Sequence, residues 1–240
     1  MSETSAEDLL TIPDTETPTA RAQQILDAIQ TVQFTGNTPE TDLIALINQS
    51  MNQNCGTVLP VLMGGALPAI SGAVLMQEMH VENQLDTAAL RGYILLSEQM
   101  QAGETPVRTE EYGTISVAVT SSRCRLLFSG TKEEPVFTVR IQIKGEISAL
   151  AKGMLRLDAT AFPILERAYA EEMIRCIEAY VHTVVHNGAD AVGLLDVMQK
   201  TIPEIRRDEK ESIEYLTKAA FDVQVVAEID RVEEEDTPYL

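Results

Sequence analysis

The chain has 240 residues, of which 45% are hydrophobic and only 5% aromatic, so it can build one large domain or two modest ones around an aliphatic core. Its 37 acidic residues outnumber its 18 Lys and Arg, and the formal net charge is −19. This charge argues against a nucleic-acid partner and against docking on an anionic membrane through a basic patch. The three cysteines, Cys55, Cys124 and Cys176, lack the C-x-x-C spacing of zinc and redox motifs.

The beginning of the chain is acidic. Residues 1–19 contain five acids and no Lys or Arg, so we expect an acidic flexible lead-in. The sequence as written has no basic and then apolar signal peptide and no run of ~18 apolar residues, so we expect it to be soluble. Two helices are predicted next, over residues 19–31 and after Thr38-Pro39, where Thr38 can cap the helix and Pro39 suits its first turn.

The middle of the chain predicts strands and one short helix. Residues 57–76 form an apolar, strand-like stretch that Gly64-Gly65 interrupts as a turn. His80 is expected in a turn. Asp86 can cap a short helix that extends through Leu95 and Leu96. A polar loop is expected to follow it, up to about residue 112.

Three further strands are predicted over residues 113–120, 124–128 and 136–147. The third has the clearest alternation in the chain. One of its faces is expected to carry Val136, Thr138, Arg140, Gln142 and Lys144, and the other Phe137, Val139, Ile141 and Ile143.

A long helix is predicted over residues 160–186, ended by Asn187-Gly188. Apolar residues at three- and four-residue steps form one stripe along it: Phe162, Leu165, Tyr169, Met173, Cys176, Tyr180 and Val184. Asp190 can cap a short helix over 191–199, and Pro203 can begin another that ends near residue 218. Residues 220–229 alternate as a closing strand, and an acidic tail follows.

One spacing could carry chemistry. His182 and His186 lie four residues apart, as metal-binding histidines on one helix face do, and Glu178 lies one turn earlier. Thr183 stands where metalloproteases have their general base. At 100° per residue the three side chains fall opposite the apolar stripe, toward water. We therefore predict no catalytic, cofactor-binding or metal-binding residues, no cofactor and no enzymatic activity.

Two alternatives stay open. The apolar, Gly-rich stretch over residues 64–76 could line the pocket of a small-ligand-binding module. Less favoured is a metal-dependent hydrolase that uses His182 and His186. The sequence contains neither a phosphate-binding loop nor a G-x-S-x-G nucleophile elbow.

Several motifs in order resemble one family. They are Leu67-Pro-Ala-Ile-Ser-Gly-Ala-Val-Leu-Met, Leu90-Arg-Gly-Tyr, Gly113-Thr-Ile-Ser-Val-Ala-Val, Val139-Arg-Ile-Gln-Ile-Lys-Gly-Glu-Ile, and Gly188-Ala-Asp-Ala-Val-Gly-Leu after the long helix. Over roughly residues 20–231 the chain resembles the C subunit of spore nutrient-germinant receptors, the Ger(x)C family. This chain departs from that pattern in lacking a lipobox Cys, most of the first domain, and the Trp expected after Pro203.

The resemblance implies a non-enzymatic accessory (C) subunit of a germinant receptor in spore germination, working by protein–protein interaction with the membrane-embedded A and B subunits. It implies a lipoprotein held by a lipid anchor on the outer face of the spore inner membrane. The expected fold class is α+β, with mixed or antiparallel sheets, helices packed on them, and a C-terminal domain built around the long helix. The expected domains are a lead-in over residues 1–19, a middle α+β domain with the remnant of a first domain over 20–130, a C-terminal α+β domain over 131–231, and an acidic tail over 232–240.

Overall fold

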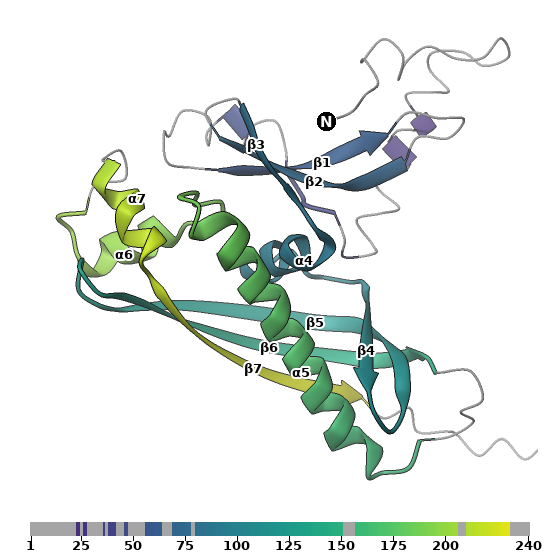
Figure 1. The fold of residues 1–240 in the computed structure, drawn as a ribbon. Helices are drawn as coiled ribbons and strands as arrows, with labels where there is room; N and C mark the ends of the chain where they lie inside the picture. Colours follow the sequence, from purple (N-terminus) through teal and green to yellow (C-terminus); the bar gives the residue numbers. More distant parts are fainter. Residues whose placement is uncertain are drawn as a thin grey trace, which may run out of the picture.

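The computed structural model describes residues 56–63, 69–77, 80–150, 157–205 and 210–230, together with a few positions before residue 48. Figure 1 shows two sheets, with a long helix laid across one of them. This arrangement confirms the predicted α+β class. The predicted lead-in, the acidic tail and nearly all of the two predicted N-terminal helices lie outside the described residues.

The first sheet is antiparallel and has three strands in the order β1-β2-β3. β1 (Thr57–Met63) and β2 (Ala69–Gln77) confirm the predicted apolar strands. β3 (His80–Leu85) was not predicted, and placing His80 in a turn was wrong. The sequence HVENQL is mostly polar and its strand is mostly exposed, so no apolar alternation marks it.

The short helix α4 (Thr87–Leu96) begins as predicted. The Asp86 carboxylate accepts a hydrogen bond of 2.7 Å from the Ala89 backbone N–H, which satisfies one of the unpaired donors at the helix start. Every residue of this helix from Ala89 onward is buried. One of them is Arg91, whose Nη2 donates to the Glu104 carbonyl at 3.2 Å.

The second sheet has four strands in the order β4-β5-β6-β7. They are β4 (Glu104–Thr109), β5 (Gly113–Gly130), β6 (Pro135–Ala149) and β7 (Ala220–Asp230). β4, β5 and β6 are antiparallel neighbours, and β7 runs parallel to β6. β4 was predicted as loop; its Pro106 lies on an edge strand, where a missing N–H is tolerated.

The predicted strands over residues 113–120 and 124–128 are one long strand, β5. Val119 pairs with Gly145 of β6 and Ser121 pairs with Lys144, so one residue of β5 is extra at this point. The two strands stay paired on both sides of this β-bulge, but the alternation of side chains shifts by one residue, which is why the sequence indicated two strands.

The β5–β6 hairpin bears on the predicted domain organisation. Its two strands stay paired as far as Gly130 and Pro135, so the predicted boundary between residues 130 and 131 falls within the turn of one sheet. We propose instead that the two structural units are the three-stranded sheet and the unit that extends from α4 to β7. Buried residues of both units belong to one hydrophobic core.

The long helix is formed by α5 (Ala161–Tyr180), which continues directly into a π-helical turn, η1 (Val181–Val185). It covers one face of the four-stranded sheet (Figure 1). Six of the seven predicted stripe residues are buried: Leu165, Tyr169, Met173, Cys176, Tyr180 and Val184. The aliphatic and aromatic side chains of β5, β6 and β7 that face this helix complete the core.

Two short helices connect the long helix to β7. They are α6 (Leu194–Thr201) and α7 (Lys210–Thr217). Both begin later than predicted. Pro203 lies in a turn rather than at a helix start, and Ile205, two residues further on, is buried.

Gly92 lies where α4 crosses α5. A Cβ atom at this position would lie 2.2 Å from the Cys176 carbonyl oxygen and 2.8 Å from Tyr180 Cβ. Real side chains essentially never approach so closely. Tyr93, the next residue, packs on Tyr180 with ring centroids 6.0 Å apart. The crossing therefore requires glycine at position 92.

We predict that Gly92→Ala destabilises the protein by at least about 2 kcal/mol, because the added methyl group overpacks the helix crossing. In an unconstrained helix interior the same change stabilises the protein by about 1 kcal/mol. A decrease in the free energy of unfolding would therefore identify the close helix crossing. Chemical denaturation measures the effect. Thr87→Ala, at an exposed position of the same helix, is the control and should change stability by no more than ~0.5 kcal/mol. A Gly92→Ala protein as stable as the wild type would contradict the close crossing.

Candidate functional site

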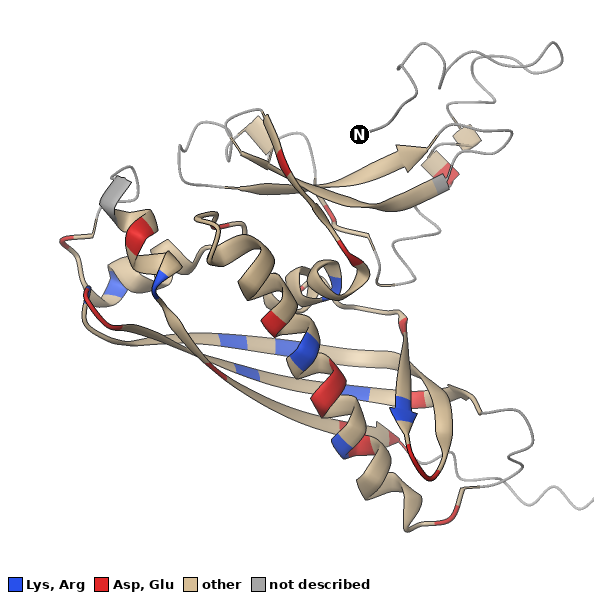
Figure 2. Cartoon of the chain, in the orientation of Figure 1, with Lys and Arg blue, Asp and Glu red and all other residues tan. Residues whose placement is uncertain are grey.

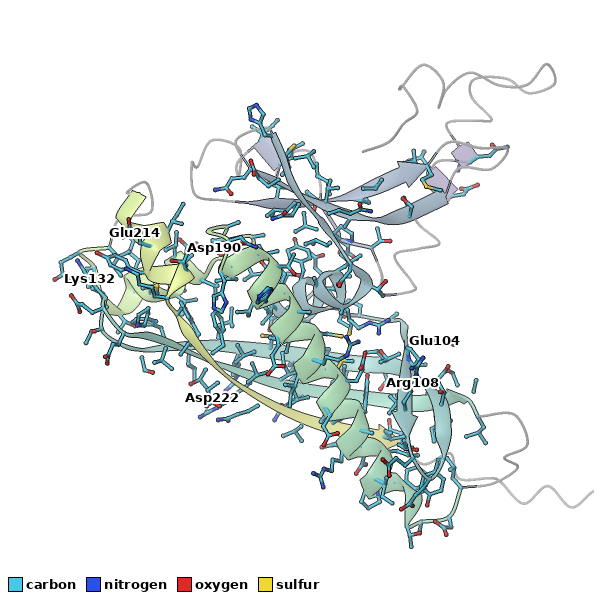
Figure 3. All side chains as sticks on the ribbon, viewed as in Figure 1. Glu104, Arg108, Lys132, Asp190, Glu214 and Asp222 are labelled. Carbon is cyan, nitrogen blue, oxygen red and sulfur yellow. The ribbon has the colours of Figure 1, made fainter. Side chains whose placement is uncertain are left out.

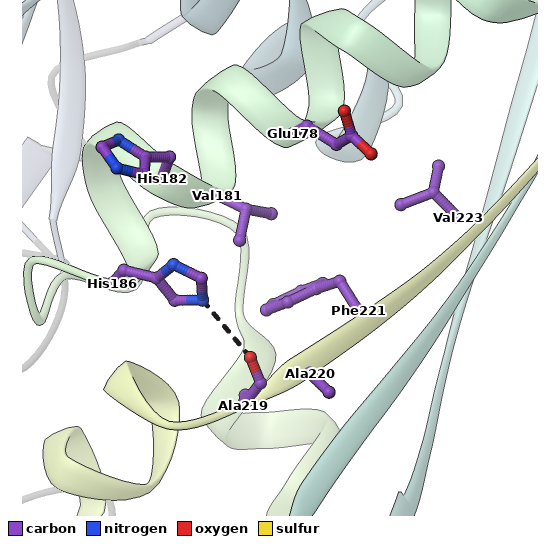
Figure 4. A pocket seen from close by; sticks show the side chains of 8 residues that line it. All are labelled: Glu178, Val181, His182, His186, Ala219, Ala220, Phe221 and Val223. Carbon is purple, nitrogen blue, oxygen red and sulfur yellow. Dashed lines mark hydrogen bonds between the residues drawn. The ribbon is translucent and has the colours of Figure 1, made fainter.

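A groove of about 340 Å³ lies between the end of the long helix and β7 (Figure 4). The helix contributes Glu178, Val181, His182 and His186, and the opposite side consists of Ala219, Ala220, Phe221 and Val223. The floor is therefore mainly apolar, and the polar groups lie along the helix side. His182, His186 and Glu178 line the same groove. The sequence did not predict that these side chains would lie beside β7.

The π-helical turn sets the direction of His186. The His186 backbone N–H donates to the Val181 carbonyl at 2.9 Å, which is the i→i+5 bond of a π-helix. This wider turn rotates His186 relative to a regular helix. The His186 Nε2 lies 3.3 Å from the Ala219 carbonyl oxygen, and its ring meets Phe221 edge-on at 6.3 Å. Because a carbonyl only accepts, this contact requires the proton on Nε2.

Metal binding is not supported by this geometry. Within the described part of the chain, no group of three or more His, Cys, Asp or Glu side chains could hold a metal ion. Glu178, His182 and His186 are all exposed, as their place opposite the apolar stripe predicted. His186 directs one ring nitrogen at a backbone carbonyl, which leaves it a single nitrogen for any other ligand.

A second polar feature is the turn between the long helix and α6, where Figure 3 labels Asp190. Asp190 is buried, and its carboxylate accepts from three backbone N–H groups: Val192 at 3.2 Å, Leu194 at 2.9 Å and Leu195 at 2.9 Å. Gly193 has a left-handed φ of +78°, which favours glycine. The Asp190 carbonyl accepts from Gly56, next to β1, at 3.0 Å. The turn thus joins α6 to the first sheet.

Burial raises the pKa of Asp190, against the opposing effect of the backbone N–H groups that its carboxylate accepts. Burial also raises the pKa of Tyr180 well above its ordinary value, and the nearby Asp190 adds to this. Both side chains are buried, and the Asp190 carboxylate is occupied by backbone N–H groups. The sequence predicted that Asp190 caps a helix beginning at residue 191. The helix instead begins at Leu194 with Gly193 at its N-cap position, but the Asp190 carboxylate still accepts from the first helical N–H groups, Leu194 and Leu195.

A larger cavity, of about 570 Å³, lies between β4 and α5 and is lined by Pro106, Arg108, Ala168, Glu171, Glu172 and Arg175. Arg175 and Glu172 satisfy each other through two hydrogen bonds, of 2.6 and 2.9 Å. Glu171 is paired with Arg167 at 3.0 Å. Neither this cavity nor the groove lies on β1 or β2. The pocket predicted over residues 64–76 stays a prediction, because residues 64–68 are outside the described part.

The fold defines an α+β protein in which a long helix covers one face of a four-stranded sheet and a three-stranded sheet lies beside this unit. Residues 71–233 match the family described as "Spore germination B3/ GerAC like, C-terminal". The chain belongs to this family, which confirms the resemblance to Ger(x)C proteins. The matched range contains Gly92 and Asp190, whose motifs had suggested the assignment.

One solved structure, titled "Crystal Structure of the GerBC protein", has the same fold with a TM-score of 0.71. The alignment covers 96% of this chain and 67% of that one, at 13% sequence identity. A search of curated proteins found no match. None of the helices in the described residues has the length and apolar character needed to cross a membrane.

We predict that Asp190→Ala destabilises the protein by about 2–4 kcal/mol, because three buried or half-buried backbone N–H groups lose their acceptor. Asp190→Asn should have a smaller effect, since one amide oxygen can still accept. Thermal and chemical unfolding measure both. Asp222→Asn, on the exposed face of β7, is the control. Equal stabilities of the Asp190→Ala and control proteins would contradict the role of this turn.

We also predict that the histidines do not form a specific zinc site. Addition of Zn²⁺ should shift the melting temperature of the wild type, His182→Ala and the control His80→Ala by the same small amount, because any effect is then non-specific. A zinc-dependent stabilisation of the wild type that His182→Ala abolishes would contradict this prediction and restore the metal hypothesis.

Proposed function

We propose that this protein acts as the non-enzymatic accessory (C) subunit of a nutrient-germinant receptor in spore germination. The observation that carries the proposal is the family match over residues 71–233, which spans most of β2, all of β3 and the whole unit from α4 to β7. Its partners would be the A and B membrane subunits. A lipid anchor, which the family resemblance implies, would hold it at the outer face of the spore inner membrane.

The described structure supports a scaffold rather than an enzyme. The groove beside β7 has an apolar floor and a carbonyl-bonded histidine, and the cavity beside β4 is lined by ion pairs formed within α5. In neither place does a nucleophile lie next to a base that a third group orients, the arrangement of covalent catalysis. The exposed faces and the long edge strand β7 are instead suited to contact with other proteins.

We predict that deleting the gene abolishes germination in response to nutrients, and that the intact gene restores it. Tagged protein from dormant spores should co-purify with membrane subunits of a germinant receptor. The Gly92→Ala variant should restore germination poorly in proportion to its loss of stability, whereas Thr87→Ala should restore it fully. Normal nutrient germination in the deletion strain would overturn the proposal.

A second candidate function is small-ligand binding, and the groove beside β7 favours it. Its volume and mostly apolar lining, with a few polar groups, are those of ligand pockets. A metabolite screen by thermal shift tests this function. We expect a true ligand to raise the melting temperature of the wild type and to lose this effect in His182→Glu, which changes the rim while leaving the core intact. No shift with any metabolite would remove this candidate.

A further inference from the structure

The face of the four-stranded sheet that points away from α5 carries a basic cluster. Arg123 and Arg125 of β5 and Arg140 of β6 are all exposed and alternate with buried residues of the core. Figure 2 shows the basic positions of β5 and β6 as neighbouring blue segments in the middle of the sheet. We call Arg123, Arg125 and Arg140 the arginine cluster. Its position is distinct from that of the groove beside β7.

Strand register brings the three side chains together. Arg125 lies directly opposite Arg140, and Arg123 lies opposite Gln142, so Arg123 and Arg140 are diagonal neighbours on the same face. Like charges in directly opposite positions of a sheet are destabilising by a few tenths of a kcal/mol to about 1 kcal/mol. Folding alone therefore does not favour this arrangement.

The same face shows how such a charge is neutralised elsewhere. Four residues beyond Arg140 on β6, Lys144 lies opposite Glu228 of β7 and forms an ion pair at 2.5 Å. The residue of β7 opposite Arg140 is Gln224, which is uncharged. Its side-chain amide donates a hydrogen bond to the Asp222 carboxylate. Within the described residues, the arginine cluster forms no ion pair or side-chain hydrogen bond. Although the chain has twice as many acids as bases, these three neighbouring guanidinium groups are exposed without an ion pair among the described residues and so are available to bind an external anion.

The surroundings of the cluster favour a polypeptide partner. Leu127 and Val226 lie on the same face and are 45% and 57% exposed. Large aliphatic side chains next to Arg suit a protein partner that has both acidic and aliphatic residues, and the flat guanidinium binds a carboxylate through two parallel hydrogen bonds.

An anionic membrane fits this face less well. Asp222, Glu228 and Asp230 lie along β7 beside the cluster, and the whole chain carries a net charge of −19. An extended anionic plane would meet these carboxylates together with the arginines, whereas a single extended segment along β5 and β6 would avoid most of them. Figure 3 labels one of these carboxylates, Asp222, on β7.

We propose that the arginine cluster is a docking site for an acidic, partly aliphatic polypeptide segment of a partner protein. The carboxylates of the segment pair with Arg123, Arg125 and Arg140, and its aliphatic side chains cover Leu127 and Val226. When the segment binds, its carboxylates offset the repulsion between Arg125 and Arg140. The repulsion therefore destabilises only the free protein.

The test measures binding of the whole protein to a short fluorescent peptide of repeated Glu-Glu-Leu, by anisotropy. The triple variant Arg123→Gln, Arg125→Gln, Arg140→Gln should bind on the order of tenfold more weakly or worse, and wild-type binding should weaken as salt rises. The matched control is Arg167→Gln, Arg175→Gln, Lys218→Gln, which changes the net charge equally away from this face. It should bind the peptide as the wild type does.

A melting curve separates binding from folding. The arginine triple variant should be at least as stable as the wild type, because it removes like-charge repulsion. Equal loss of peptide binding in both triple variants would overturn the proposal, since net charge alone would then explain it. Binding to phosphatidylglycerol vesicles that requires the arginines, without binding to the peptide, would also overturn it and assign the face to a membrane.

Discussion

At the crossing of α4 and α5 the two backbones approach so closely that a methyl group at position 92 has no space. This contact holds the long helix against α4, while the other members of its apolar stripe cover the four-stranded sheet. Arg91, the neighbour of Gly92, extends from the same crossing to the Glu104 carbonyl at the start of β4. The Arg91-Gly92 pair thus sets how closely α4 packs on α5 and ties α4 to the start of β4.

The crossing of α4 and α5 also positions the C-terminal end of the long helix. Its π-helical turn directs His186 to the Ala219 carbonyl and Phe221, and so determines how the helix meets the first residues of β7. A few residues later the Asp190 carboxylate starts α6, and the Asp190 carbonyl holds Gly56 beside β1. The Arg91-Gly92 pair and the Asp190 turn, which lie in two of the motifs that suggested the family, are therefore structural joints.

Because α5 covers one face of the four-stranded sheet, side chains on the opposite face can serve a function with the least effect on core packing. Residues there alternate with core residues and can change without altering packing. The arginine cluster uses this freedom, and it lies within the range that matches the GerAC-like family.

Local patterns in the sequence determined the fold class, the buried stripe of α5, the two faces of β6 and the caps at Asp86 and Asp190, because each depends on neighbours within a few residues. The same patterns missed β3 and β4, which are edge strands with polar or Pro-containing sequences, and divided β5 at its bulge. Only tertiary structure decided that Arg125 lies opposite Arg140 and that His182 and His186 border a groove with Phe221. Those pairings join residues far apart in the chain, and strand register and helix packing, which no local pattern encodes, bring them together.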